Sequence, residues 1–162
     1  MARISKENYY LDIAETVLER STCLRRQYGA IIVRNDEIIS TGYNGAPRGR
    51  KNCVDMGSCT REVLQIPSGQ RYELCRAVHA EANAIISAPR RDMIGATIYL
   101  VGRDAKTGEL LSGATSCSMC RRMIINAGLE KVVIRTSPTT FDVVPVSHWI
   151  AEDDTLTELT LF

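Results

Sequence analysis

Residues 96–102 read ATIYLVG and residues 131–136 read KVVIRT, and both are β-type runs. Between them, residues 117–127 form a short segment of helical character, and Gly128 follows as a natural C-terminal cap. The connection from that helix to the second run is short, which favours parallel strands joined by a crossover helix. This strand–helix–strand unit places the chain in the α/β class.

The rest of the chain predicts two helices and a β-hairpin, and leaves the C-terminal residues undecided. Leu11, Ala14 and Leu18 form an apolar stripe at helical spacing within residues 8–19, and Ser5 is a suitable N-cap. Runs at 30–33 (AIIV) and 37–43 (EIISTGY) predict a hairpin that turns through RNDE. A helix over 78–88 stops at Pro89, whereas the last twenty residues fit either an edge strand or a short helix.

Composition narrows the functional classes. The 162 residues fit one domain, 1–162, and a net charge of +1 provides no overall field for holding nucleic acid. No run of eighteen apolar residues occurs, so we expect no membrane span, and the N-terminus lacks the pattern of a signal peptide. We therefore expect a cytoplasmic protein whose six cysteines are reduced thiols or metal ligands.

Residues 44–75 form a Cys-rich insert that is long, irregular and rich in glycine and proline. A compact domain rarely carries so long an irregular segment unless the segment is functional or something fixes it in place. The insert ends four residues before His79, one of only two histidines in the chain.

Two short motifs carry the chemistry. Cys117 and Cys120 lie at i and i+3 on a predicted helix start, where they face the same way and where the helix dipole stabilises thiolates. Together with His79 they make three zinc ligands, which leaves one position open for water. Glu81 lies about 200° around a regular helix from His79, so we expect it to act on that water as an acid–base group rather than as a ligand.

Each of these residues also has a simpler explanation. The cysteines fit a buried pair or a redox pair, His79 fits a core histidine, and Glu81 fits a solvated helix charge. The joint pattern of HAE followed by CxxC, each at a predicted helix start, favours the catalytic zinc.

At these motifs the chain resembles the zinc-dependent cytidine/deoxycytidylate deaminase superfamily, and within it the deoxycytidylate (dCMP) deaminases. The matching segments are YGAIIV (28–33), STGYNGAP (40–47), CRAVHAEANAI (75–85) and TIYL (97–100). The resemblance runs from about residue 8 to residue 136.

The resemblance implies a three-layer α/β/α sandwich with a five-stranded mixed sheet. His79, Cys117 and Cys120 would hold the catalytic zinc, and Glu81 would be the proton shuttle while zinc hydroxide attacks C4 of cytosine. Asn44 would hydrogen-bond the nucleotide near its sugar, and the backbone around Ala80 would line the base pocket. The reaction would convert dCMP to dUMP and ammonia, supplying dUMP for thymidylate synthesis.

The resemblance also implies regulation and assembly. In this family the GYNG loop lies near a subunit contact where dCTP can bind, so Asn44, Gly45, Arg48 and Arg50 are candidate contacts for dCTP or dTTP. The implied assembly is a homohexamer. The near-neutral charge argues against nucleic acid as a partner, and the absence of a long apolar run argues against a membrane.

The chain departs from the family in two places. Ser116 stands where the family has proline before the first cysteine of CxxC; zinc ligation does not need that proline, and serine can cap the helix. The family also often has an aromatic residue near the substrate phosphate, in the region where this chain has Pro138 and, nearby, Phe141.

Four cysteines remain after CxxC: Cys23, Cys53, Cys59 and Cys75. Four thiolates are a complete ligand set for a closed tetrahedral zinc, so the sequence predicts a second, structural zinc that would fix the insert. His148 could replace Cys23 as the fourth ligand. The alternative is four free thiols.

Three other functions remain open from the sequence. One is deamination of another cytosine nucleotide or nucleoside, such as dCTP, and a second is deamination of tRNA adenosine. The third is a zinc-stabilised protein that binds nucleotides without turning them over.

Overall fold

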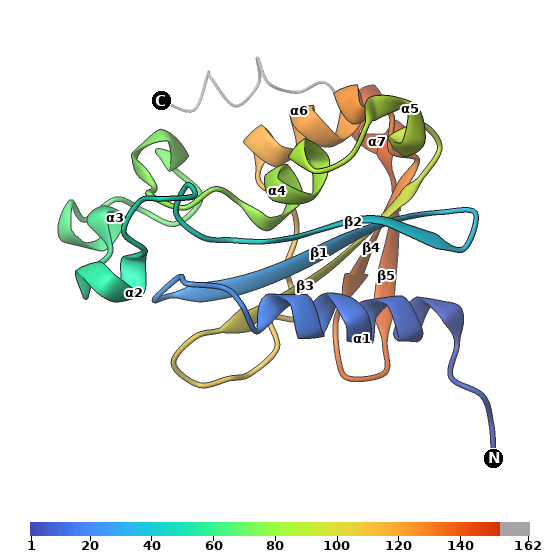
Figure 1. The fold of residues 1–162 in the computed structure, drawn as a ribbon, viewed down its shortest axis with the longest axis horizontal. Helices are drawn as coiled ribbons and strands as arrows, with labels where there is room; N and C mark the ends of the chain where they lie inside the picture. The colour runs from blue at the N-terminus through green and yellow to red at the C-terminus, as the bar shows by residue number, and fades with distance from the viewer. Residues whose placement is uncertain (153–162) are drawn as a thin grey trace.

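The computed structural model describes residues 1–152, and Figure 1 shows the course of the chain. The strands are β1 (Arg26–Arg34), β2 (Glu37–Tyr43), β3 (Thr97–Asp104), β4 (Lys131–Arg135) and β5 (Phe141–Pro145). The helices are α1 (Lys6–Leu18), α2 (Cys53–Met56), α3 (Thr60–Val63), the 3-10 helix η1 (Tyr72–Leu74), α4 (Ala80–Ile86), α5 (Arg90–Met93), α6 (Ser118–Ala127) and α7 (Val146–Ala151).

The strands form one mixed sheet in the order β2-β1-β3-β4-β5. Only β3 and β4 run parallel, with Thr97 opposite Lys131, and helix α6 crosses between them as the sequence predicts. The β1–β2 and β1–β3 pairs are antiparallel, and so is β4–β5. The α/β class and the five-stranded mixed sheet are therefore confirmed.

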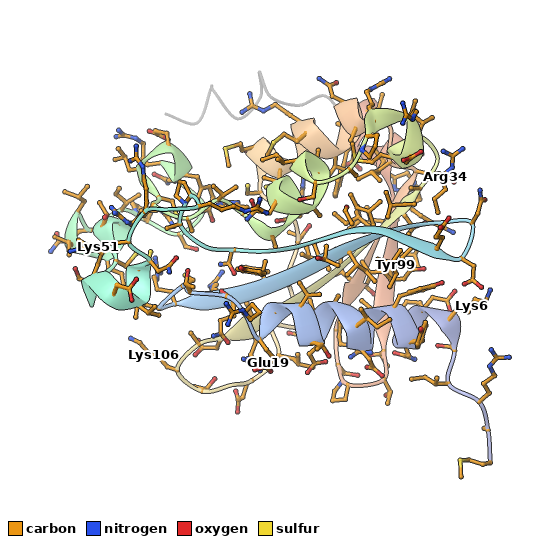
Figure 2. All side chains as sticks on the ribbon, in the orientation of Figure 1. Lys6, Glu19, Arg34, Lys51, Tyr99 and Lys106 are labelled. Atoms are coloured by element: carbon orange, nitrogen blue, oxygen red, sulfur yellow. The ribbon has the colours of Figure 1, made fainter. Side chains whose placement is uncertain are left out.

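The sheet lies between two layers of helices (Figure 1), so each face has its own apolar core. On one face α1 packs Leu11 and Leu18 against Ile31 and Tyr99, and Figure 2 shows Tyr99 between the sheet and that helix. The other face is covered by α4, α5, α6 and α7, with Ile98 and Ile124 among its buried residues. In the part of the chain that the structure describes, no helix is long and apolar enough to cross a membrane.

The local predictions hold with small shifts at the element ends. Ser5 caps α1 by accepting a hydrogen bond from the Asn8 amide at 3.2 Å, and Gly128 ends α6 with φ +82°. Asn35 and Asp36 both have positive φ, which matches a tight hairpin turn of the primed type. The local sequence patterns predict only four strands. The structure adds β5 at residues 141–145 and then helix α7, so both alternatives for the final residues occur in part, and residues 153–162 lie outside the described chain.

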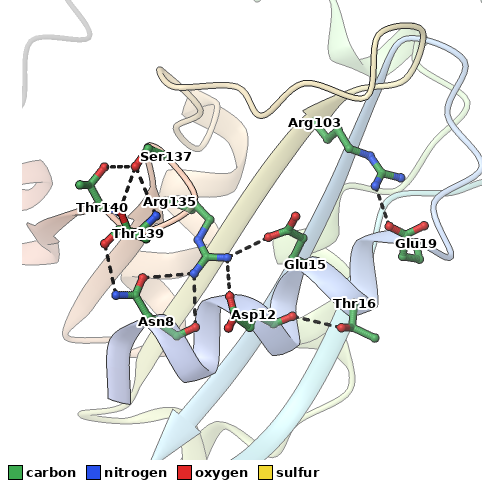
Figure 3. Close-up of polar contacts among 10 residues, drawn as sticks. All are labelled: Asn8, Asp12, Glu15, Thr16, Glu19, Arg103, Arg135, Ser137, Thr139 and Thr140. Atoms are coloured by element: carbon green, nitrogen blue, oxygen red, sulfur yellow. Dashed lines mark hydrogen bonds and ion pairs between the residues drawn. The ribbon is translucent and has the colours of Figure 1, made fainter. Parts of the chain in front are cut away.

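A buried arginine fixes α1 to the end of β4 (Figure 3). Arg135 is 2% exposed, and its Nη1 lies 2.7 Å from Oδ1 of Asp12 and 2.8 Å from Oε2 of Glu15. Its Nη2 donates to Asn8, whereas its Nε has no hydrogen-bond partner among residues 1–152. Because the guanidinium is buried, removing its two carboxylate partners would lower the free energy of unfolding more than removing a surface ion pair would.

We expect the double substitution Asp12→Asn, Glu15→Gln to lower the free energy of unfolding by about 1–3 kcal/mol, because it leaves a buried guanidinium without a counter-charge. Urea denaturation measures the change. Arg135→Met is the matched comparison and should cost less, since it leaves only carboxylates that water already reaches. A larger loss in Arg135→Met would mean that hydrogen bonding to Asn8, rather than charge pairing, holds the helix.

Candidate active site

Helix α4 lies unusually close to β2. A Cβ built on Gly42 would come within 2.3 Å of the Ala80 carbonyl oxygen and 2.4 Å of the Ala84 amide nitrogen, so only glycine fits there. The Ser40 hydroxyl donates to the Ala84 carbonyl oxygen at 2.7 Å. The start of α4 is thereby held at one distance from the sheet.

The loop after β2 fixes the residue that precedes this helix. Gly45 and Val78 exchange backbone hydrogen bonds of 3.1 and 2.7 Å, and the Asn83 side chain donates to the Tyr43 carbonyl oxygen at 2.8 Å. His79 therefore enters α4 as an extended N-cap, with φ −70° and ψ 156°. The predicted start of the helix at residue 78 is two residues too early, so the 200° argument for Glu81 does not apply to the actual backbone.

The first turn of α6 brings both sulfurs to His79. Cys117 is the N-cap of that helix, and its Sγ accepts from the Cys120 amide at 3.4 Å. Nδ1 of His79 lies 3.5 Å from Sγ of Cys117 and 3.4 Å from Sγ of Cys120. Tetrahedral zinc with ordinary bond lengths separates a nitrogen from a sulfur by about 3.6 Å, so the three atoms fit a zinc ion.

The charges of this group are strongly coupled. Burial alone would lower the pKa of His79, but hydrogen bonds to Cys117 and Cys75 outweigh it and raise that pKa to about 10. The hydrogen bond with Cys120 is the largest of the influences that lower the pKa of Cys117 to about 4. The same contact, together with burial, raises the pKa of Cys120. Without a metal, these directions favour an ionised Cys117 beside protonated Cys120 and His79.

Glu81 lies in the first turn of α4 and is 5% exposed. Burial raises the pKa of its carboxyl, against the opposing effects of its own backbone amide and the Ser116 hydroxyl. The Ser116 residue is 1% exposed, and its Oγ lies beside Glu81 without a hydrogen bond of standard geometry. Glu81 is not among the three groups that share ligand spacing, so it stands next to them as an independent acid or base.

A cavity opens over these residues. It is lined by Cys23, Arg25, Arg26, Tyr28, Asn44, Cys59, Arg61, Ser68, Tyr72, Cys75, Ala77, His79, Glu81, Thr115 and Cys117. Ala80 is buried and does not line it, although both of its neighbours do. The Asn44 amide is largely engaged by protein: its Oδ1 accepts from the Tyr28 amide at 2.9 Å, and its Nδ2 donates to the Arg26 carbonyl oxygen at 2.8 Å.

The sequence did not predict several of the residues that line the cavity. Arg25, Arg26 and Arg61 bring three guanidinium groups to the cavity, and Tyr28 and Tyr72 bring two phenol rings. No local pattern marks the arginines. Tyr72, however, is the only aromatic residue in the Cys-rich insert, and that feature of the sequence could have identified it as a candidate.

The other predicted residues take varied positions. Cys23, Cys53, Cys59 and Cys75 gather near one another, since the pKa of Cys53 is raised first by burial and then by its three neighbours. Within residues 1–152, however, only the His79 group has three ligand atoms within 4.8 Å of one another. His148 lies on α7, at the end of the molecule away from the insert (Figure 1).

The remaining predicted residues lie in the loop after β2 and in the segment after β4. Gly45 is buried, whereas Arg48 and Arg50 are exposed. All three belong to the first part of the insert, where Figure 2 labels Lys51. Phe141 packs against the core on the α1 face, and neither it nor Pro138 lines the cavity.

Comparison with known proteins gives a consistent result. Residues 4–136 match the family model described as the cytidine and deoxycytidylate deaminase zinc-binding region. The chain is 36% identical to a deoxycytidylate deaminase of Mycobacterium phage D29 over 138 residues, which is 82% of this chain and 96% of that protein. It is 34% identical to the deoxycytidylate deaminase of Schizosaccharomyces pombe over 135 residues, 83% of this chain but only 38% of the yeast protein.

Solved structures agree with this match. A dCMP deaminase from the cyanophage S-TIM5, solved with dCMP and dUMP, is 25% identical with a TM-score of 0.53, covering 82% of this chain and 84% of that one. Cytidine deaminase from Mycobacterium tuberculosis, at 14% identity and a TM-score of 0.51, shares the fold. The matched zinc-binding region and the His79–Cys117–Cys120 geometry together support one zinc in this chain.

Zinc binding at pH 7 should release two protons from this group, one from His79 and one from Cys120. The pKa of His79 is raised and that of Cys120 is raised, so both carry protons that the metal displaces, whereas Cys117 is already a thiolate. Calorimetric titration of zinc in two buffers of different ionisation enthalpy gives the number. Subtracting the same titration of a Cys117→Ser, Cys120→Ser variant isolates this group, and a difference near zero would contradict the charge assignment.

Proposed function

This chain belongs to the family of zinc-binding cytidine and deoxycytidylate deaminases, and from that premise we propose that it hydrolyses dCMP to dUMP and ammonia. The observation that carries the proposal is the placement of a buried carboxyl, Glu81, beside a His–Cys–Cys group with zinc spacing in a single cavity. The named activity of the phage and yeast relatives supports dCMP as substrate.

His79, Cys117 and Cys120 would hold the metal. When bound, the zinc supplies a Lewis acid that makes water nucleophilic near neutral pH. The three ligands fill three of the four positions, so the cavity side stays available for the reacting water.

Glu81 would move the protons. Attack of water at C4 of cytosine forms a carbon–oxygen bond, and departure of the 4-amino group breaks a carbon–nitrogen bond. The two water protons end on ring nitrogen N3 and on the departing ammonia, and the Glu81 carboxyl can carry each in turn. Its burial supports this role, because a desolvated carboxyl accepts a proton more readily than an exposed one.

The arginines at the cavity support a phosphorylated substrate. Nε of Arg25 lies 2.9 Å from Oε1 of Glu62, and Arg61 donates to backbone carbonyl oxygens of the insert. Arg26 is exposed and forms no ion pair within residues 1–152. We propose that Arg26 receives the phosphate, that the free N–H of the Asn44 amide reaches the sugar, and that the backbone around Ala80 borders the base.

A second zinc on Cys23, Cys53, Cys59 and Cys75 is part of the proposal. Its support is the gathering of four thiols at the insert, and their closure to ligand spacing would accompany metal binding. Arg48 and Arg50, with Asn44 and Gly45, are proposed contacts for dCTP or dTTP, and a homohexamer is the proposed assembly; both rest on the family resemblance. A cytoplasmic location suits the use of reduced thiolates as ligands.

Glu81→Gln should keep its zinc and lose activity on dCMP by about 10²–10⁴-fold in kcat, because the amide cannot accept a proton. Ammonia release measures the rate, and metal analysis measures zinc. The same assay offers dCTP, cytidine and an RNA hairpin alongside dCMP, with and without added dCTP. Near-normal turnover by the variant would refute the proton shuttle, and wild-type protein that binds dCTP but releases no ammonia from any substrate would indicate a non-catalytic nucleotide sensor.

Metal analysis of the wild-type protein should give two zinc ions per chain. Cys59→Ser should give one and keep the catalytic zinc, and Cys117→Ser should give one and keep the insert zinc, because the two ligand sets share no residue. One zinc in the wild type, unaffected by Cys59→Ser, would show that the four cysteines are free thiols.

A further inference from the structure

The insert places an aromatic ring directly against the metal-binding histidine. The rings of Tyr72 and His79 have centroids 4.9 Å apart and planes at 87°, an edge-to-face contact. Tyr72 opens η1, seven residues before His79, and both line the cavity. The contact therefore joins the Cys-rich insert to the catalytic group.

Arg61 packs over the same ring. Its Cζ lies 4.4 Å from the centroid of the Tyr72 ring, and the residue is only 6% exposed. Nη2 donates to the carbonyl oxygens of Pro67 and Gln70 at 3.0 and 2.8 Å, and Nε donates to Gln70 at 3.2 Å.

The charge of Arg61 makes this contact stronger than a surface one. Within the described residues its guanidinium has no carboxylate partner, so besides the two backbone carbonyl oxygens it meets the π-face of Tyr72. A desolvated cation–π contact is stronger than an exposed one, because water does not compete for the cation.

We propose that Tyr72 is a positioning residue that fixes the imidazole plane of His79 for metal binding, and that Arg61 holds Tyr72 in place. The proposal rests on the proposed role of His79 as a zinc ligand. Nδ1 meets both sulfurs at 3.4–3.5 Å in only one ring orientation, and an edge-on ring at this distance obstructs rotation about the Cβ–Cγ bond. Residues that orient a ligating histidine commonly change metal affinity by 10–100-fold when removed.

The ring, and not the phenol hydroxyl, carries this role. Tyr72→Phe should therefore behave as wild type, whereas Tyr72→Leu should loosen the histidine. Tyr72→Met keeps apolar volume and serves as a second ring-less variant if the leucine variant fails to fold. Arg61→Met should shift the site in the same direction as Tyr72→Leu. Glu73→Gln, an exposed neighbour on η1, is the matched control and should change nothing.

The experiment uses cobalt(II)-loaded full-length protein, with the ligand-field spectrum and the rate of metal loss to a chelator as readouts. Each variant is compared with the same variant carrying Cys117→Ser and Cys120→Ser, so that the difference reports only the His79 group. We expect Tyr72→Leu or Tyr72→Met to release cobalt about tenfold faster or more and to shift the spectrum, with both values restored in Tyr72→Phe. Unchanged spectrum and release rate in the ring-less variants would overturn the proposal.

This outcome is separate from that of the proposed function. If the wild-type difference spectrum shows no cobalt at the His79 group, the metal assignment itself fails, and the role of Tyr72 falls with it. If the wild type binds cobalt there and the ring-less variants match it, only the positioning role is refuted. Deaminase activity enters neither readout.

Discussion

The close approach of α4 to β2 is the constraint on which the site depends. With a side chain at position 42, the Ala80 carbonyl oxygen would have to move, and the start of α4 would move with it. The backbone pairing of Gly45 with Val78 then sets where His79 leaves the extended segment and enters the helix. Gly42 in β2 and Gly45 after it thus set the position of the His79 imidazole without contacting it. The two sulfurs come from the start of α6, which covers the same face of the sheet as α4. The parallel strands β3 and β4, which α6 connects, set the position of that helix.

Much of this arrangement was predictable from sequence because it is local. Periodicity located α1, the hairpin, β3, α6 and β4, and the cap residues Ser5 and Gly128 marked helix ends within a residue or two. The three-ligand group could be proposed from spacing together with the family resemblance. The sequence left the β5 region undecided between an edge strand and a helix because β5 is short and only partly buried, so its pattern of side chains is weak.

The lining of the cavity was not predictable for a different reason. Tyr72 meets His79, and Arg61 meets Tyr72, through the irregular path of the insert, which no periodic pattern describes. Asn44 has a structural role that its sequence position did not indicate, because its amide ties the start of β1 to the loop after β2. Long-range contacts of this kind depend on the folded path of the chain, whereas composition and spacing report only neighbours in sequence.

Cys117 is also open to chemical modification that is separate from the proposed reaction. The pKa of the Cys117 thiol is lowered, chiefly by the hydrogen bond with Cys120, and the residue lies at a helix start on a cavity wall. Without a metal it is therefore a good nucleophile toward alkylating and oxidising agents. Peroxide would convert such a sulfur to a sulfenic acid, and further oxidation would be irreversible. A metal bound to Cys117 would occupy the same sulfur lone pairs. Metal binding would therefore protect this cysteine from oxidation as well as complete the site.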